Sequence, residues 1–340
     1  MNIVFIHLNA LVPKFLQSNI ERTCKLFPKN KIFLLTDQVF TNSKLPNLNV
    51  INIDFEEKHI LLESTLSHPK NFRNNFGFLC VVRLMLFEKF MVNNSEPFLH
   101  VESDVIISDD FPFEKFLNLE AQIAYPVVNS THSISSCIFI RNHATASLLS
   151  NFTLTYAQKN PLTDDMEVLS NFRRSYPDIF QLLPTVPSNE SALLTKSVSF
   201  KEENTRAIEI FKGFFDGYDL GRYLIGDDPR NFSGKSRVRY QYKDSGFNIR
   251  AIEFKPIFGR TFPGILVKET SHVLPVYSLH IHSKKIKFFR KIFFGYFIDK
   301  AVKKSKDKPK IVYNVRLTVK SIPTRFSNKI KSYYESRYNL

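Results

Sequence analysis

Two acidic residues follow an apolar segment of this 340-residue chain and could hold a cation together. Residues 97–107 have the composition of a buried β-strand, and side chains two positions apart in a strand point to the same face. Glu102 and Asp104 are spaced in this way. Neighbouring carboxylates are costly unless a proton or cation neutralises them, and a divalent ion with a bound diphosphate would do so. The alternative is a strand end followed by a solvated turn.

Two histidines late in the chain could complete such a site. Residues 273–282 are expected to form a strand, which would place His280 and His282 on one face. One of them could be a third metal ligand. A neutral imidazole suits Mn²⁺ better than Mg²⁺, which prefers oxygen. The alternative is a pair of solvent-facing histidines on an edge strand.

An acidic cluster opens a predicted helix over residues 164–175. We expect Asp164 to cap this helix, while Asp165 and Glu167 lie where they would complement the positive end of its dipole. A carboxylate in this position could also act as a general base. Both roles stay open for Asp165 and Glu167, and Asp165 is the preferred candidate for catalysis.

The segments that would position these residues alternate between strand and helix. Such alternation favours an α/β fold, with a mainly parallel central sheet covered by helices. Predicted strands cover residues 2–8, 31–36, 49–54, 97–107, 121–128, 136–140 and 273–282, and predicted helices cover residues 14–27, 75–92, 145–158 and 164–175. The helix over residues 75–92 is apolar on nearly all sides, so we expect it to be buried.

The chain resembles the GT-A glycosyltransferases at two places. That family has an Asp-x-Asp motif at the end of a central strand, preceded by a long helix with an arginine that contacts the donor. Here Glu102-Ser103-Asp104 matches the motif, and Arg83 in FGFLCVVRLMLFEKF matches the arginine. Glutamate replaces the first aspartate, while Asp104 matches the more constant metal ligand. An ion pair on the helix surface is the alternative for Arg83.

The resemblance implies a GT-A, Rossmann-like domain over residues 1–284. It would move a sugar from a nucleoside-diphosphate sugar to a glycan or lipid-linked acceptor, with Mn²⁺ or Mg²⁺ as cofactor. His280 or His282 would be the late metal ligand of the family. Stereochemistry, sugar and acceptor are not implied.

The resemblance also assigns roles to further residues. Asp165, with Glu167 beside it, would face the acceptor hydroxyl. Asp37, at the end of a predicted strand, would contact the nucleoside, although a turn acid is the alternative. Asp216 lies in a Gly-rich stretch similar to one that lines the substrate pocket of microbial sugar transferases, where it could bond sugar hydroxyls. Lys284 would join the donor contacts.

Most of the positive charge lies at the end of the chain. Residues 283–340 hold 17 Lys and Arg against three acids, which accounts for nearly all of the net charge of +15. This distribution does not support a basic groove across the body, and we expect no nucleic-acid partner. Residues 285–340 are predicted to be a basic, helical extension, with Ile286, Phe289, Phe293 and Phe297 at helical spacing. It would attach to an anionic membrane surface or pack on the catalytic domain; nucleic-acid binding is a third alternative, but no recognised nucleic-acid motif accompanies the basic residues.

The remaining features favour a cytoplasmic protein, with peripheral membrane attachment possible through the tail. Three widely spaced cysteines predict neither a disulfide framework nor a zinc site. The apolar start lacks the basic region of a signal peptide, and no run of 18 uncharged apolar residues occurs. The competing functions are a nucleotidyltransferase, disfavoured because HLNALVPK follows the first strand where a Gly-rich loop is usual, and an inactive adaptor that has lost metal binding.

Overall fold

The computed structural model describes residues 1–40, 45–71, 74–128, 133–187, 198–225, 252–257, 260–268 and 270–290. The helices are α1 (Lys14–Leu26), α2 (Glu57–Thr65), α3 (Phe76–Val92), α4 (Phe113–Leu117), α5 (His143–Lys159), α6 (Asp165–Ser175), α8 (Val198–Phe211), α9 (Asp219–Ile225) and α10 (Lys287–Arg290), with a 3₁₀ turn at Pro177–Ile179. None of the helices in these ranges is long and apolar enough to cross a bilayer.

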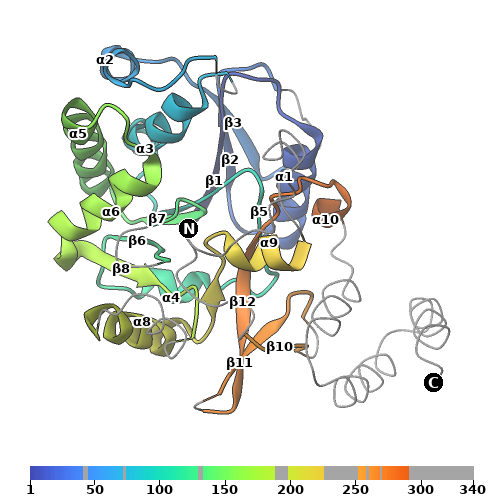
Figure 1. Cartoon of the computed structure of the whole chain (residues 1–340). Coiled ribbons are helices and arrows are strands. Elements are labelled where there is room, and N and C mark those ends of the chain that lie inside the picture. Colours follow the sequence, from blue (N-terminus) through green and yellow to red (C-terminus); the bar gives the residue numbers. More distant parts are fainter. Residues whose placement is uncertain are drawn as a thin grey trace, which may run out of the picture.

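A seven-stranded sheet forms the centre of the molecule (Figure 1). Its order is β3-β2-β1-β4-β7-β6-β8, and the strands are β1 (Asn2–His7), β2 (Ile32–Thr36), β3 (Leu48–Asn52), β4 (Phe98–Val101), β6 (Ile123–Pro126), β7 (Cys137–Ile140) and β8 (Phe180–Leu183). Only β7 among them runs against the others, since it pairs antiparallel with β4 and β6. The predicted α/β fold with a mainly parallel sheet is confirmed.

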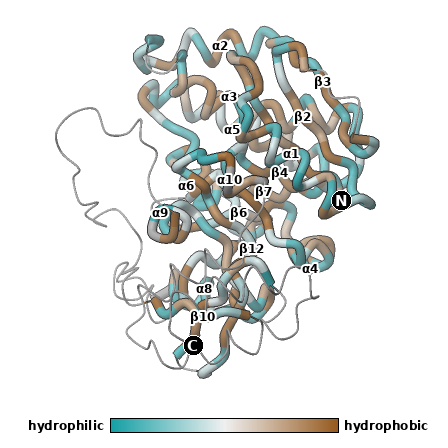
Figure 2. Tube along the Cα trace, turned by 90° about the vertical axis from the view of Figure 1, so that its right-hand side faces the viewer, coloured by the Kyte–Doolittle hydropathy of each residue, from teal (hydrophilic) through white to brown (hydrophobic). Residues whose placement is uncertain are grey.

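Helices cover both faces of this sheet. Helix α3 packs on α5 over one face, whereas α1 lies over the other (Figure 1). Successive residues of β1 divide between the two layers: Val4 belongs to the α3 side and Phe5 to the α1 side. The inner strands of the sheet are accordingly buried and mainly hydrophobic (Figure 2). The prediction that residues 75–92 form a buried helix is confirmed, because most side chains of α3 are buried.

A second sheet attaches the late part of the chain to the acidic segment. Its order is β10-β11-β12-β5, with β9 beside β12, and the strands are β5 (Val105–Ile107), β9 (Phe214–Phe215), β10 (Phe254–Lys255), β11 (Gly264–Val267) and β12 (His272–His280). Strand β12 runs antiparallel to β5 and places His280 opposite Val105. This pairing brings the late histidines to the acidic segment.

The segment predicted as one strand, residues 97–107, is two strands in two sheets. Strand β4 ends at Val101 and β5 starts at Val105, and between them the amide of Val105 bonds to the carbonyl of Glu102 at 3.0 Å. The prediction of a continuous strand was therefore wrong, because this turn carries the chain from one sheet to the other. The acidic residues lie in the turn, just past the carboxyl end of β4.

The start of the basic extension packs on the body of the protein. Phe288 and Phe289 of α10 are buried, and the ring centroid of Phe289 lies 5.6 Å from that of Phe15 on α1. These two phenylalanines therefore share the core with the domain that we predicted to end at residue 284. The rest of the predicted amphipathic helix, with Phe293 and Phe297, lies outside the described residues.

Candidate active site

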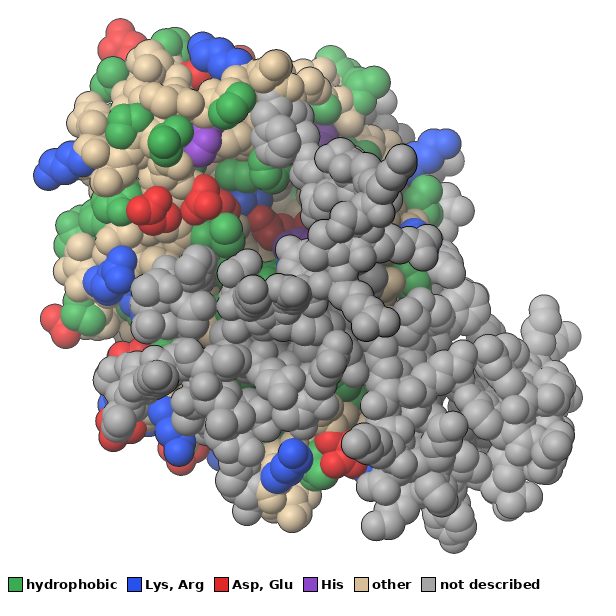
Figure 3. Space-filling view, viewed as in Figure 1, with side chains coloured by type: hydrophobic (Ala, Val, Ile, Leu, Met, Phe, Trp, Pro, Cys, Tyr) green, Lys and Arg blue, Asp and Glu red, His purple; other side chains and the backbone are tan. Residues whose placement is uncertain are grey.

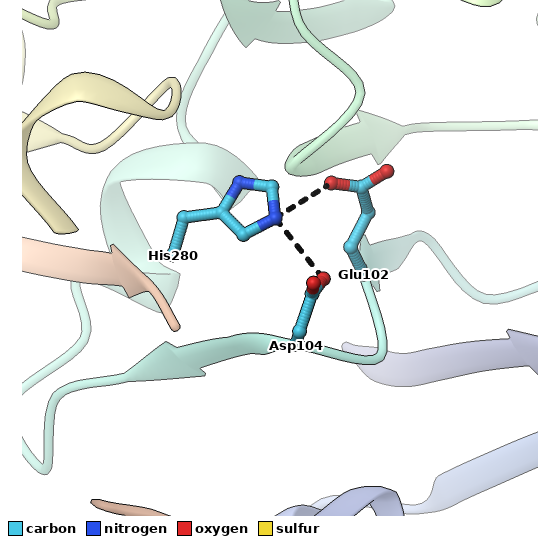
Figure 4. Close-up of side chains that lie close together, drawn as sticks. All are labelled: Glu102, Asp104 and His280. Atoms are coloured by element: carbon cyan, nitrogen blue, oxygen red, sulfur yellow. Dashed lines mark hydrogen bonds and ion pairs between the residues drawn. The ribbon is translucent and has the colours of Figure 1, made fainter. Parts of the chain in front are cut away.

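Three potential metal ligands converge at the carboxyl edge of the central sheet (Figure 4). Glu102 and Asp104 lie on the turn after β4, and His280 ends β12. The imidazole Nε2 of His280 is 3.0 Å from Asp104 Oδ1 and 3.7 Å from Glu102 Oε2. One atom from each residue lies within 4.8 Å of the other two. The carboxylates thus converge as expected, although a turn and not a strand positions them.

The backbone around His280 fixes the orientation of its ring. Nδ1 lies 3.2 Å from the carbonyl oxygen of Gly217, so an Nδ1–H would donate there and leave Nε2 directed at the carboxylates. The amide of His280 donates to the carboxylate of Asp216 at 2.9 Å. Two contacts from the β9–α9 connection therefore hold His280 in place.

Opposite charges perturb the pKa values of the buried pair. Burial alone would raise the pKa of the Asp104 carboxyl, but the charge and hydrogen bond of His280 and the charge of Lys284 hold it well below its usual value. Burial alone would lower the pKa of His280, yet the charge of Asp104, their hydrogen bond and the charge of Glu102 raise it to about 9. Both shifts favour an imidazolium paired with a carboxylate when no cation is bound.

Arg83 closes the other side of the cluster. Its guanidinium donates to Glu102 Oε1 at 2.7 Å, to Asp165 Oδ2 at 2.6 Å and to Ser135 Oγ at 2.9 Å. Burial would lower the pKa of Arg83, but the two carboxylates raise it above its usual value. The alternative of a helix-surface ion pair does not describe this contact, because the side chain is only 15% exposed.

Ser135 belongs to the site although no sequence pattern indicated it. It lies on the connection between β6 and β7, is buried, and its hydroxyl is 2.5 Å from Asp165 Oδ2 and 3.0 Å from Glu102 Oε1. A lone serine in a loop has no spacing rule that would mark it. Only the packing of α3, α6 and the β4–β5 turn around it reveals its place.

The three acidic residues at the start of α6 lie in different environments. Asp164 caps the helix as predicted, since its carboxylate accepts from the amide of Glu167 at 2.8 Å. Asp165 is 7% exposed and faces the cluster through Arg83. Glu167 is exposed and accepts from the hydroxyl of Tyr156 at 3.0 Å. Of the two carboxylates expected near the acceptor, Asp165 is the one beside the cluster.

The predicted donor residues are spread over the same edge of the sheet. Lys284 Nζ is 3.2 Å from Asp104 Oδ2, so it belongs to the cluster. Asp37 follows β2, and both of its carboxylate oxygens accept from the amide of Asn9, after β1, at 2.8 and 2.9 Å. It therefore ties the ends of β1 and β2 together.

Asp216 and His282 lie behind the cluster. Besides the amide of His280, the carboxylate of Asp216 accepts from the amides of Leu220 and Gly221 at 2.9 and 2.7 Å, and the residue is 1% exposed. Its carboxylate thus binds backbone amides, whereas we expected it to contact sugar hydroxyls. The ring of His282 stacks on that of His280 at 3.9 Å, and its Nε2 is 3.1 Å from the carbonyl of Tyr218.

The three converging side chains fit a divalent cation. Two carboxylates and one imidazole are a donor set that Mn²⁺ accepts readily, and the nitrogen makes Mg²⁺ the poorer match. The second ring nitrogen of His280 already has a carbonyl partner, as metal-binding histidines usually have. Lys284 lies at this point and could meet a diphosphate. Figure 3 shows acidic and histidine side chains gathered near the centre of this face.

Several solved structures are similar to this chain at low identity. A galactosyltransferase, LgtC, in complex with donor and acceptor sugar analogues is 12% identical, with a TM-score of 0.43, over 60% of this chain and 83% of its own. Mouse xyloside xylosyltransferase 1 is 10% identical, with a TM-score of 0.36, over 54% of this chain and 84% of its own. The chain is structurally similar to glycosyltransferases.

A third similar structure matches this chain over a smaller part of its own length. The glycosyltransferase GlyE of Streptococcus pneumoniae TIGR4 is 14% identical, with a TM-score of 0.36, over 54% of this chain and 44% of its own. None of these overlaps reaches a TM-score of 0.5, so we take no substrate or mechanism from them. No protein-family model and no curated protein matches the chain.

Proposed function

We propose that this protein is a metal-assisted glycosyltransferase that uses a nucleoside-diphosphate sugar as donor. One observation supports this proposal above the others: Glu102, Asp104 and His280 converge at the carboxyl edge of a mainly parallel sheet. Ligands of open α/β sheets bind at that edge. A site with two carboxylates, an imidazole and a nearby lysine suits a metal ion and a diphosphate together.

Each residue of the site has a proposed task. Glu102, Asp104 and His280 would hold Mn²⁺ or Mg²⁺, which when bound offsets negative charge on the departing diphosphate. Lys284 would exchange its contact with Asp104 for one with a phosphate oxygen. Asp37 would lie near the nucleoside, because the ends of β1 and β2 meet beside it. Both Asp165 and Glu167 remain candidates for the acceptor side, and Asp165 lies closer to the cluster.

The proposed function is tested by donor hydrolysis with a panel of nucleotide sugars, with and without Mn²⁺. We expect at least one donor to be hydrolysed faster with Mn²⁺. The variant Asp104→Ala should lose this activity and the Mn²⁺-dependent binding of the donor, while its circular dichroism stays unchanged. A matched control is Asp178→Ala, which removes an exposed aspartate of the 3₁₀ turn.

Two results would contradict the proposal. One is the absence of hydrolysis and of calorimetric binding for every donor tested. The other is an equal donor affinity for wild type and Asp104→Ala in the presence of Mn²⁺. Transfer of a nucleotidyl group from a nucleoside triphosphate, measured in the same assay, would instead support the competing enzyme class.

We further propose that the basic extension brings the enzyme to an anionic membrane surface, where a lipid-linked or surface glycan would be the acceptor. The support is the charge distribution, with 17 Lys and Arg against three acids after residue 282. Each basic residue near an anionic surface contributes about 1 kcal/mol. Because α10 packs on α1, the membrane-binding part would begin after Arg290.

A further inference from the structure

The two carboxylate oxygens of Glu102 face different sides of the site. Oε1 accepts from Arg83 at 2.7 Å and lies 3.0 Å from the hydroxyl of Ser135. Oε2 points the other way and lies 3.7 Å from Nε2 of His280. One side chain thus spans the distance between the buried guanidinium and the cation site.

The length of the Glu102 side chain allows it to reach both Arg83 and His280. An aspartate lacks one methylene, so its carboxylate would end about 1.5 Å nearer to the backbone. From the same backbone position it would lose either the ion pair with Arg83 or the approach to His280. Asp104, two residues later, has no comparable task, because its carboxylate faces His280 and Lys284.

The other partners of Arg83 prevent it from following a shorter side chain. Asp165 accepts from Nη2 at 2.6 Å, and Ser135 lies between the two acids with its hydroxyl in reach of both. Three segments therefore hold the guanidinium of Arg83: α6 through Asp165, the β6–β7 connection through Ser135, and the β4–β5 turn through Glu102. Since all four side chains are largely buried, none can shift without leaving a charged or polar group unpaired.

We propose that Glu102 is a bridge between the cation site and Arg83, and that Arg83, Ser135 and Asp165 are positioning residues which fix it. This inference rests on the metal site of the proposed function. It explains why glutamate occupies the first acidic position: the residue type matches the distance between Arg83 and the cation. A change to aspartate, which would recreate an Asp-x-Asp sequence, should weaken the site.

The experiment measures Mn²⁺ binding without donor, by calorimetry and by the electron paramagnetic resonance of the bound ion. Wild type should bind one Mn²⁺. Glu102→Asp should bind it about tenfold to a hundredfold more weakly, the range typical for loss of a supporting partner. Ser135→Ala should weaken binding by a similar factor although the hydroxyl touches no ligand atom of the cation. Ser64→Ala, an exposed serine of α2, is the control and should bind as wild type.

A double-variant comparison separates positioning from general stability. If Ser135 acts through Glu102, then Ser135→Ala should have little further effect in a Glu102→Ala background. Asp165→Asn, which can still accept from Ser135 and Arg83, should retain more affinity than Asp165→Ala. Thermal unfolding of each variant shows whether it is folded at the temperature of the titration.

The outcomes distinguish this inference from the proposed function. If wild type and Glu102→Asp both bind Mn²⁺ with equal affinity, the proposed bridging role of Glu102 is wrong, whereas the metal site is supported. Additive effects of Ser135→Ala and Glu102→Ala would likewise overturn the positioning role. If wild type binds no Mn²⁺ and no Mg²⁺, the metal site and the inference fail together.

Discussion

The proton on His280 is the feature that governs the site at the scale of single residues. Its pKa is raised to about 9, so below that pH an incoming metal must displace a proton from Nε2. We expect Mn²⁺ affinity to rise about tenfold per pH unit between pH 6 and 9 and to level off above it. Titrations in a single buffer mixture across this range, with His280→Gln as the comparison, would measure the slope. A flat profile for wild type would contradict the role of His280.

The two late histidines should differ sharply when each is replaced. His280 contacts the carboxylates, whereas His282 contacts a backbone carbonyl, and burial and the charge of His280 hold the pKa of His282 well below its usual value. We therefore expect His280→Gln to lower Mn²⁺ affinity by at least about tenfold, and His282→Gln to lower it much less. Calorimetry on both variants tests this. Equal losses would mean that the stacked pair acts as one unit.

Some residues of this site could be predicted from the sequence. Others could not, because their roles depend on contacts between distant segments. Asp104 and Glu102 could be found because acids at i and i+2 after an apolar run can converge, and because they match a family motif. Arg83 was found through a family pattern. Ser135 could not be found, because its role depends on three other segments that meet around it. The backbone-binding role of Asp216 was missed for the same reason, since its partners appear only when α9 meets β12.

At the scale of secondary structure, the turn between β4 and β5 is the element that sequence patterns obscured. Phe98–Val101 and Val105–Ile107 are both apolar and buried, so one continuous strand was the natural prediction. The sheet order could not be predicted either, because β12 pairs with β5 from about half the chain length away. The hydrophobic periodicity of a segment indicates which of its sides is buried. It does not indicate which distant strand pairs with that segment.

Helix α9 and strand β12 approach each other so closely that Gly221 has no room for a side chain. A Cβ at this position would overlap the carbonyl oxygen of His280 and come within 2.8 Å of the Asp216 carboxylate. We expect Gly221→Ala to lower the free energy of unfolding by about 1–3 kcal/mol, as overpacking does, and to weaken Mn²⁺ binding through His280. Chemical denaturation and calorimetry would measure both effects. Glu209→Ala, an exposed change on α8, is the control and should alter neither.

At the scale of the whole molecule, buried neutral histidines should make the fold sensitive to acid. His59 is fully buried, accepts from the amide of Glu56 through Nδ1 at 2.9 Å, and has its pKa lowered by burial to about 4. Burial and the charge of Arg83 also hold the pKa of His100 well below its usual value. The unfolded chain would therefore take up protons first as the pH falls below about 6.5.

The expected result is a loss of stability of up to about 1.4 kcal/mol per pH unit and per histidine as the pH falls from about 6.5 towards 4. Urea denaturation at several pH values, with a chelator present to exclude metal effects, would measure it. His59→Gln should flatten part of the curve, whereas replacing the exposed His143 should not. A stability that stays constant from pH 7 to 5 would contradict this prediction.

Removal of the basic extension should separate membrane binding from catalysis. We expect a chain that ends at Arg290 to keep donor hydrolysis, because Phe288 and Phe289 remain in the core, and to lose binding to vesicles that contain anionic lipid. A chain that ends at Lys284 should be less stable, since it lacks both phenylalanines. Co-sedimentation with vesicles at low and high salt tests this, because salt screens exposed charges. Failure of the full chain to bind at low salt would refute the membrane proposal.

The sequence separation between Asp104 and His280 has a consequence for the order in which the proposed metal site is made. Asp104 and His280 are 176 positions apart, yet their side chains are 3.0 Å apart in the folded protein. A ribosome therefore releases both acidic residues long before the histidine that completes their site. Until β12 has been synthesised and has joined β5, Asp104 lacks its partners His280 and Lys284, whereas Glu102 can already pair with Arg83. Under the proposed function, retention of Mn²⁺ would mark a chain whose synthesis has passed residue 280 and in which β12 has joined β5.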